Sequence, residues 1–299
     1  MSLVSGPVTV TVPATSANLG PGFDCLGLAL DLHDTLTGEV ADAGLVVEIV
    51  GEGADSLPRD ETHLVVRAMS AAFAAAGVGP GGLRLRCDNV IPQARGLGSS
   101  SAAIVGGLAL ARALLDDGAS LLPDSVLLAL ANQLEGHPDN VAPALFGGFV
   151  VCGQTDEDVW ADQAPIAREI SAVVFVPPTG VSTEAARGLL PAEIPHAAAA
   201  ANTGRAALLV TALGHAPQRL LRATEDFLHQ EYRASAMPES LALVHALRAD
   251  GHAAVVSGAG PTVLVLTADG PGELLGRCPD GWSAYPLEVD HAGVRTVAS

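Results

Sequence analysis

The chain has 299 residues, 49% of them hydrophobic and 16% charged, and its formal net charge at pH 7 is −18. This length suits one large or two medium globular domains, and the negative charge argues against nucleic acid and anionic membranes, which bind basic surfaces. All 15 basic residues are arginine, which excludes Schiff-base chemistry on lysine and a phosphate-binding lysine.

Neither the cysteines nor the first residues suggest export. The four cysteines are far apart and form no C-x-x-C pair, so free thiols are expected rather than a disulfide framework or a zinc site. The N-terminus lacks the basic and then apolar pattern of a secretory signal, and no apolar run reaches the ~20 residues that cross a membrane. We therefore expect a cytoplasmic protein with no membrane partner.

Hydrophobic periodicity separates strands from helices in the first half of the chain. Strands are expected at residues 7–13, 26–32, 34–40, 45–50, 83–90 and 144–152. Helices are expected at residues 63–76, 102–115 and 125–135. Glycine, proline and polar residues predict loops at residues 15–24 and 136–143.

An acidic, irregular stretch at residues 155–165 marks the expected boundary, which gives domains 1–155 and 156–299. Beyond it, strands are expected at residues 171–176, 253–257, 262–267 and 282–289. Helices are expected at residues 183–190, 197–213, 217–229, 240–249 and 272–277. Strands and helices that alternate irregularly in both halves predict an α+β fold.

The most informative stretch reads IPQARGLGSSS and lies between a predicted strand and a predicted helix. Glycines let the backbone approach an anion, and the free N–H groups and dipole of a helix start favour negative charge. The stretch lacks G-K-[ST] and is therefore no Walker A loop. The alternative is an ordinary helix cap on a tight turn. The expected nucleotide-binding residues are Ile91, Pro92, Gln93, Ala94, Arg95, Gly96, Leu97, Gly98, Ser99, Ser100 and Ser101.

A second polar stretch, TSANLGPGFD, follows the first predicted strand. Glycine and proline shape a turn there, and Asn18 and Asp24 are its polar side chains. Asp24 can accept hydrogen bonds from an ammonium or hydroxyl group, and Asn18 can both donate and accept. The alternative is an Asx turn that only stabilises itself.

A third stretch, EGHPDNVAP, follows a predicted helix that ends at Glu135. A magnesium–nucleotide site takes one or two oxygen ligands from the protein. Glu135 fits this role, and a loop serine, Ser100, is the candidate second ligand. His137 fits a substrate-orienting role better, because magnesium prefers oxygen. The alternative is a polar helix end and loop.

Two arginines and a glycine-rich turn complete the candidate residues. The sequence STEAAR ends at Arg187, and Arg233 follows a tyrosine further on. An arginine fork can bind a carboxylate with two hydrogen bonds, although a lone surface arginine is usually a solvated charge. The turn SGAGPT lies between two predicted strands, and its alternative is a plain hairpin.

The loop resembles the phosphate loop of the GHMP small-molecule kinases, P-x-x-x-G-L-G-S-S, which matches from Pro92 to Ser100 position by position. The turn P-A-T-S-A-N-L-G-P-G-F-D and the stretch EGHPDNVAP resemble motifs of the homoserine kinases, whereas the galactokinase and mevalonate kinase signatures are absent. This resemblance implies a two-domain α+β GHMP kinase fold. The N-terminal domain would be similar to ribosomal protein S5 and the C-terminal domain to ferredoxin, with the active site between them.

The resemblance also implies an activity, which is ATP-dependent phosphorylation of the L-homoserine hydroxyl in threonine biosynthesis, with Mg²⁺ as cofactor. It implies that Glu135 and Ser100 hold the metal, and that no dedicated general base is needed. Arg187 and Arg233 would hold the substrate carboxylate and Asp24 its ammonium group. The implied catalytic residues are Asn18, Asp24, Asn140 and Arg187, and the implied substrate-binding residues are these four with His137 and Arg233.

One position departs from the family pattern T-N-L-[IV], because His63 replaces the asparagine in T-H-L-V. The selectivity for adenine is therefore left open. Two alternatives to homoserine phosphorylation remain, a sibling kinase for another small alcohol and a nucleotide-binding sensor without turnover. The oligomeric state is also open, with a homodimer among the options.

Overall fold

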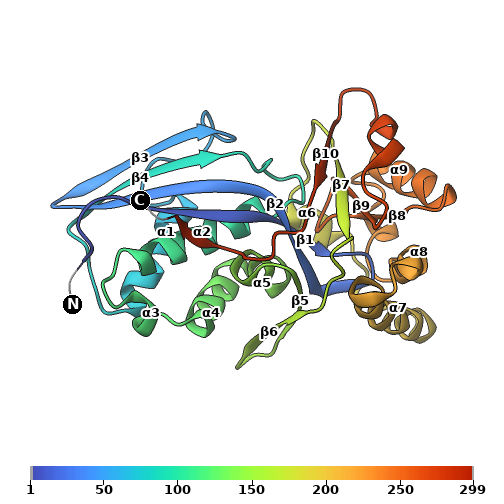
Figure 1. The fold of residues 1–299 in the computed structure, drawn as a ribbon, viewed down its shortest axis with the longest axis horizontal. Helices are drawn as coiled ribbons and strands as arrows, with labels where there is room; N and C mark the ends of the chain where they lie inside the picture. The colour runs from blue at the N-terminus through green and yellow to red at the C-terminus, as the bar shows by residue number, and fades with distance from the viewer. Residues whose placement is uncertain (1–2, 298–299) are drawn as a thin grey trace.

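The protein forms two sheets with helices packed against them (Figure 1). The structure is a computed structural model that describes residues 3–297. The elements of the first half are β1 (Val8–Asn18), β2 (Gly22–Ala41), β3 (Gly44–Gly51), α1 (Leu64–Ala75), β4 (Gly82–Asn89), α2 (Ser99–Ala113), α3 (Gly118–Leu121), α4 (Asp124–Glu135), α5 (Pro138–Phe146), β5 (Phe149–Gln154) and β6 (Val159–Ala164). Those of the second half, where η marks a 3-10 helix, are β7 (Ser171–Val176), α6 (Thr183–Gly188), α7 (His196–His215), η1 (Pro217–Arg219), α8 (Leu220–Ala223), η2 (Glu231–Arg233), α9 (Pro238–Ala249), β8 (Ala253–Val256), β9 (Val263–Thr267), η3 (Gly272–Arg277), β10 (Ser283–Leu287) and β11 (Arg295–Val297). Across these residues, no helix is both long and apolar enough to cross a membrane.

Within the described residues, the larger sheet has seven strands in the order β11-β1-β2-β4-β3, and β5 pairs with both β2 and β6. The smaller sheet has four antiparallel strands in the order β10-β7-β9-β8. Helices α1, α2, α4 and α5 lie along one face of the larger sheet (Figure 1). On β4, Leu83, Leu85 and Cys87 are buried while Arg84 and Arg86 are exposed, as the alternating pattern predicted. The two-domain α+β fold is therefore confirmed.

The first two strands are longer than predicted. β1 continues through the polar stretch that follows Pro13, so most of the loop expected at residues 15–24 is strand. Polar side chains concealed this part of β1, because Ser16 is fully buried and its hydroxyl accepts a hydrogen bond from the Ser257 hydroxyl at 2.8 Å. β2 is one strand rather than two, and its expected break is a bulge opposite Pro13.

The polar loop expected at residues 136–143 is instead the helix α5. Pro138 occupies its first turn, where a missing N–H breaks no helical hydrogen bond. Pro143 lies inside the helix and cannot donate to the carbonyl of Asp139, four residues earlier. That carbonyl packs against Gly27, where a Cβ would come within 2.0 Å of it. The two prolines and the polar sequence therefore predicted a loop, whereas packing against β2 stabilises a helix.

Two other elements are shorter than predicted. The strand expected at residues 144–152 begins only at Phe149, because α5 occupies the preceding residues. The helix expected at residues 217–229 is divided into η1 and α8 and ends at Ala223. The Asp226 carboxylate then accepts hydrogen bonds from backbone N–H groups two, three and four residues ahead, which closes a turn in place of a helix.

The predicted boundary between residues 155 and 156 divides a hairpin, because β6 pairs with β5 in the larger sheet. β6 has a largely polar, exposed sequence that carries little apolar alternation. The C-terminal strand β11, which the sequence did not predict, also returns to the larger sheet and pairs with β1. The larger sheet therefore extends to the end of β6 and includes the last strand of the chain.

Candidate active site

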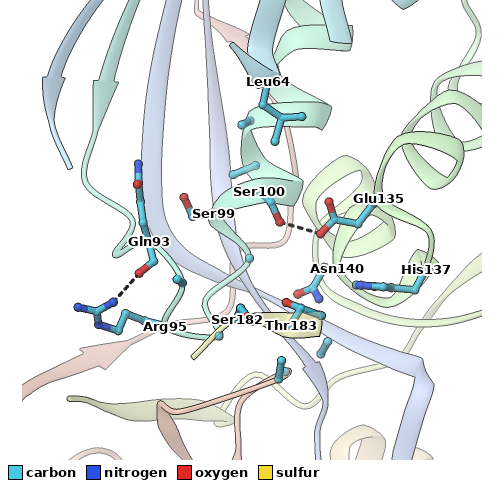
Figure 2. A pocket seen from close by; sticks show the side chains of 18 of the residues that line it. Leu64, Gln93, Arg95, Ser99, Ser100, Glu135, His137, Asn140, Ser182 and Thr183 are labelled. Atoms are coloured by element: carbon cyan, nitrogen blue, oxygen red, sulfur yellow. Dashed lines mark hydrogen bonds between the residues drawn. The ribbon is translucent and has the colours of Figure 1, made fainter. Parts of the chain in front are cut away.

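A cavity of about 370 Å³ lies between the two domains. The first domain lines it with residues 93–96 and the start of α2, and the second with residues 181–183 and 258–260. In Figure 2, Leu64 lies at one end of the pocket, Ser99 and Ser100 lie in the middle, and Thr183 lies at the opposite end. The predicted phosphate loop therefore occupies the centre of the cleft.

Two glycines with left-handed backbone shape this loop, Gly96 with φ 80° and Gly98 with φ 70°. A Cβ on Gly96 would come within 2.2 Å of the Ser257 carbonyl oxygen, and one on Gly98 within 1.9 Å of the Thr15 hydroxyl. Gly98 caps α2 without a side chain, and the first turn of α2 has no acidic residue. The N–H groups of that turn are therefore left for an anion to bind. The alternative interpretation, an ordinary helix cap made by a serine side chain, is not what the structure has.

Not every residue of the predicted loop faces the cleft. The side chains of Ile91 and Leu97 are fully buried in the core, so only their backbone can contribute to a nucleotide site. The Arg95 guanidinium donates to the carbonyl oxygens of Pro177 at 3.0 Å and Pro178 at 2.5 Å. Arg95 therefore ties the predicted phosphate loop to the segment that leads into α6.

The predicted metal ligands do come together. The Ser100 hydroxyl donates to Oε1 of Glu135 at 2.7 Å (Figure 2). The Ser101 hydroxyl donates to the same oxygen at 2.9 Å. Glu135 ends α4, and Gly136 follows with φ 93°, which turns the chain away after the carboxylate. A carboxylate and a hydroxyl beside a phosphate-binding helix start are the oxygen donors that Mg²⁺ takes, so these residues fit the metal.

Asp24 and Arg187, 163 residues apart in the chain, form an ion pair with two hydrogen bonds of 2.6 and 3.0 Å. Asn18 fixes Asp24, because its Oδ1 accepts from the Asp24 backbone N–H at 3.0 Å while its Nδ2 donates to the Gly258 carbonyl at 2.9 Å. Asn18 lines the cleft as expected, but both ends of its amide are used by the backbone. These two hydrogen bonds suit Asn18 to positioning Asp24.

Arg233 is a buried cation at the cleft, with 1% of its surface exposed. Its guanidinium donates to the Gly258 carbonyl at 3.2 Å and to Nδ1 of His229 at 3.0 Å. Nε2 of His229 donates in turn to the Gly20 carbonyl at 2.8 Å, and burial lowers the pKa of His229, so this ring is neutral. The Phe23 ring lies 5.5 Å from the Arg233 guanidinium and 5.4 Å from that of Arg187.

His137 and Asn140 lie next to Glu135 beside the predicted phosphate loop (Figure 2). Nδ1 of His137 lies 2.8 Å from the Asp139 carboxylate, which is 1% exposed. Burial opposes charge on His137, but the hydrogen bond and charge of Asp139 outweigh it and raise the pKa of His137. Burial also raises the pKa of Asp139. Oδ1 of Asn140 accepts from the Thr15 hydroxyl at 2.9 Å, which fixes the orientation of its amide.

Thr183 and Asp34 are among the cleft residues that were not predicted site residues. Thr183 points into the cavity next to Ser182, which caps α6 by accepting from a backbone N–H at 3.1 Å (Figure 2); the STEAAR motif already contained both. Asp34 lines the cavity from β2 and has the same strand parity as the buried residues Leu36 and Gly38. That parity was the available signal, because an acidic residue on the buried face of a strand requires a reason.

The GHMP kinase N-terminal domain family matches residues 63–148, and the GHMP kinase C-terminal family matches residues 208–275. Homoserine kinase of Streptomyces avermitilis is 55% identical over 287 residues, which cover 96% of this chain and 94% of that protein. The chain belongs to the GHMP kinases.

Other comparisons place this GHMP kinase in the homoserine kinase family. It is 51% identical to homoserine kinase of Clavibacter michiganensis, over 96% of this chain and 92% of that protein. The crystal structure of homoserine kinase from Cytophaga hutchinsonii has a TM-score of 0.87 at 26% identity, with 99% of each chain covered. Mevalonate diphosphate decarboxylase from Staphylococcus aureus, with a TM-score of 0.71 at 16% identity over 98% of each chain, shares the fold alone.

Proposed function

We propose that this GHMP kinase transfers the terminal phosphoryl group of ATP to the hydroxyl of L-homoserine, which gives O-phospho-L-homoserine and ADP in threonine biosynthesis. One observation carries the proposal. A single cavity holds a helix N-terminus that suits phosphate and, beside it, a carboxylate and two guanidinium groups that suit an amino acid. Relatives named homoserine kinase, at 46–55% identity, support the same acceptor.

The acceptor end matches the charges of an amino acid. Asp24 suits the ammonium group, whereas Arg187 and Arg233 suit the carboxylate. Asp24 and Arg187 already form an ion pair with each other. A bound zwitterion would replace it with two ion pairs, one between Asp24 and the substrate ammonium group and one between Arg187 and the substrate carboxylate. Among the described residues, Arg233 has no carboxylate within salt-bridge distance, so its buried charge is available to the substrate anion.

Binding and orientation account for the chemistry that these residues can do. The N–H groups at the start of α2 would bind the phosphates and stabilise the charge that develops during transfer. Glu135 and Ser100 would hold Mg²⁺, which supplies further positive charge there. Asn140 and Thr183 lie on the side of Ser100 away from Leu64 (Figure 2). There they would hold the acceptor hydroxyl in line with the terminal phosphate.

Neither of the two candidate general bases, Asp24 and Asp139, has a free carboxylate. Asp24 is paired with Arg187, and Asp139 is buried and hydrogen-bonded to His137. We therefore propose that the hydroxyl attacks directly and that its proton passes to an oxygen of the transferred phosphoryl group.

The test is ADP release with MgATP and, in turn, L-homoserine, L-serine, L-threonine, mevalonate and galactose. We expect turnover largely confined to homoserine. Turnover of a different alcohol would retain the kinase activity but overturn the roles of Asp24, Arg187 and Arg233. ATP binding without turnover of any acceptor would favour a nucleotide sensor.

A further inference from the structure

The proposed acceptor end of the cleft has a buried histidine behind it that the mechanism above does not use. His229 is fully buried, and its ring lies between Arg233 on one side and the turn that joins β1 to β2 on the other. The ring also packs against Phe23, with the two ring centroids 5.3 Å apart. His229 thus contacts a proposed carboxylate-binding residue from outside the cavity, whereas Arg233 itself lines the cavity.

The surroundings of His229 select one form of its ring. Two acceptors face Nε2, the Gly20 carbonyl oxygen at 2.8 Å and the more distant Asp226 carboxylate at 3.6 Å, whereas the Arg233 cation faces Nδ1. Burial lowers the pKa of His229, and the charge of Arg233 adds to this effect. The carboxylates of Asp226 and Asp24 and the hydrogen bond to Gly20 oppose it without reversing it. The neutral ring therefore carries its hydrogen on Nε2 and offers the lone pair of Nδ1 to Arg233.

This lone pair helps to fix the orientation of the Arg233 guanidinium. Nη1 donates to Nδ1 of His229 at 3.0 Å and to the Gly258 carbonyl at 3.2 Å, which uses both of its hydrogens. Nε donates to the Ala186 carbonyl at 3.4 Å. Nη2 has no hydrogen-bond partner among residues 3–297. Because a guanidinium is planar, bonds that hold Nε and Nη1 also fix the direction of Nη2, which is left for a ligand.

The carbonyl that orients the His229 ring belongs to the turn that leads to Asp24. Gly20 lies in this turn with φ 88°. The side-chain amide of Asn202 donates to the next carbonyl along the turn, that of Pro21, at 2.7 Å, which holds the turn against the second domain. His229 therefore connects the segment that carries the proposed ammonium ligand to the proposed carboxylate ligand.

We propose that His229 is a positioning residue for the acceptor: its Nδ1 holds the Arg233 guanidinium so that Nη2 faces the substrate carboxylate, and its bond to Gly20 sets how far this guanidinium lies from Asp24. The inference rests on the proposed function, which takes an amino acid as acceptor. The ammonium and carboxylate groups of an amino acid share one carbon, so the separation of their two ligands must match the substrate. A guanidinium without this support would have to be ordered by the substrate, which lowers affinity.

Two amide variants separate the two nitrogens of the ring. In His229→Asn, the short side chain places an oxygen near the position of Nδ1, where it can accept from Arg233. In His229→Gln, the longer side chain places its amide near the position of Nε2, where it can donate to Gly20 but leaves Arg233 without that acceptor. Both variants are neutral and lose one of the two hydrogen bonds of a buried ring, so both should melt below wild type.

The measurement is the preference for a free carboxylate, expressed as the ratio of kcat/KM for L-homoserine to kcat/KM for L-homoserinamide, which has a neutral amide in that place. We expect this ratio to fall about tenfold in His229→Gln and less than about threefold in His229→Asn, with the KM for ATP unchanged in both. The control is His215→Gln, at an exposed histidine of the second domain, which should match wild type. Equal ratios in the two variants of His229 would make this histidine a packing residue and overturn the proposal.

The form of the ring can be measured in the wild-type protein, without a substitution in this buried region. Two-bond ¹H–¹⁵N correlations of histidine-labelled protein distinguish a ring with its hydrogen on Nε2 from the other neutral form and from the charged ring. The His229 signal is assigned from its contact with the Phe23 ring. We expect the Nε2–H form, unchanged between about pH 6 and pH 8. A charged ring in this range could not accept from Arg233 and would overturn the proposal.

Failure of the proposed function gives a different result from failure of this inference. If the wild-type enzyme turns over no acceptor that has an amino-acid carboxylate, the function fails and the inference fails with it. If the wild-type enzyme phosphorylates homoserine and His229→Gln keeps the same preference for the carboxylate, the inference alone is overturned.

Discussion

The proposed phosphate end and the proposed acceptor end of the cleft are built in different ways. The phosphate end uses backbone, namely the left-handed Gly96 and Gly98 and the first turn of α2, which are adjacent in sequence. The acceptor end uses side chains from three distant segments, Asp24, Arg187 and Arg233. A short motif can specify the first kind of site, whereas the second exists only after the two domains have packed together.

The two kinds of site are also damaged in different ways. Backbone ligands cannot be deleted by substitution, but an added methyl group can displace them. Side-chain ligands can be removed singly, with loss of one contact and little disturbance of the rest. Substitutions at the two ends should therefore separate into large effects on nucleotide binding and more graded effects on the acceptor.

Gly98→Ala should have the largest effect. The new Cβ would come within 1.9 Å of the Thr15 hydroxyl at a residue with φ 70°, so backbone strain and overpacking together cost about 2–5 kcal/mol. We expect ADP affinity, measured by calorimetry, to fall about 100-fold or more. Ser99→Ala, which leaves the backbone in place, should change it less than about threefold. Equal losses in the two variants would show that serine side chains, and not backbone, bind the nucleotide.

The buried carboxylate of Asp34 should be visible in the pH dependence of stability. Burial raises its pKa from 3.8 to about 6, with the hydrogen bonds from Ile91 and Val90 opposing the rise and Glu52 adding to it. The folded state thus holds the proton more tightly than the unfolded chain, so this contribution is complete below pH 4 and lost as the pH rises through 6.

Asp34→Asn removes this titration. In urea unfolding, we expect the variant to gain about 2 kcal/mol over wild type between pH 4 and pH 7.5. Asp88→Asn, at an exposed carboxylate on the neighbouring strand β4, should show no such gain. Parallel pH profiles for wild type and Asp34→Asn would show that the carboxylate is not strained by burial.

Asp24→Asn should weaken the acceptor end selectively. Loss of a charged hydrogen bond to the substrate ammonium costs about 1.5–3 kcal/mol, so the KM for homoserine should rise at least about tenfold. The KM for ATP should be unchanged, and the preference for substrates with a free amino group should decrease. Abolished turnover with an unchanged KM would instead assign Asp24 the role of a general base.

Arg95→Lys should have the smallest effect and should test how the two ends communicate. A lysine cannot reproduce the guanidinium bonds to Pro177, Pro178 and Gln93, and the released segment leads into α6, which carries Arg187. We expect the KM for homoserine to rise about fivefold, or about 1 kcal/mol, with less change for ATP. Homoserine titrations with and without ADP should show weaker coupling between the two ligands.

The outcome for Arg95→Lys has a matched control in Arg84→Lys, which alters an exposed arginine on β4. A rise in the KM for ATP alone would contradict the coupling role, because it would place the Arg95 guanidinium on phosphate.

Local patterns predicted the parts of the molecule whose structure depends on neighbours in sequence. The strand at residues 83–90 and the helix that follows the phosphate loop were found from apolar periodicity. Elements whose stability comes from distant partners were missed. α5 contains two prolines and is completed by Gly27, and β11 has three exposed residues that hydrogen bonds to β1 hold in place.

The site divides in the same way. Motifs identified Glu135 and Ser100 as neighbours, and the structure brings their side chains to 2.7 Å. Resemblance placed Asp24 and Arg187 in the site without showing that they pair with each other. Nothing in the sequence indicated that the Arg95 guanidinium donates to the carbonyl oxygens of Pro177 and Pro178, because a guanidinium can bond to any carbonyl or phosphate within its reach.

By itself, the sequence determined the α+β class, the phosphate loop and the family, since glycine conformations and helix starts are set by contiguous residues. Only the tertiary structure decided which charges meet across the cleft and which buried nitrogens lack a hydrogen-bond partner. It also decided that the polar stretch predicted as a loop at residues 136–143 forms the helix α5. The physical reason is that side-chain partners are chosen by distance in space, and residues such as Asp24 and Arg187 become neighbours only through the packing of two domains.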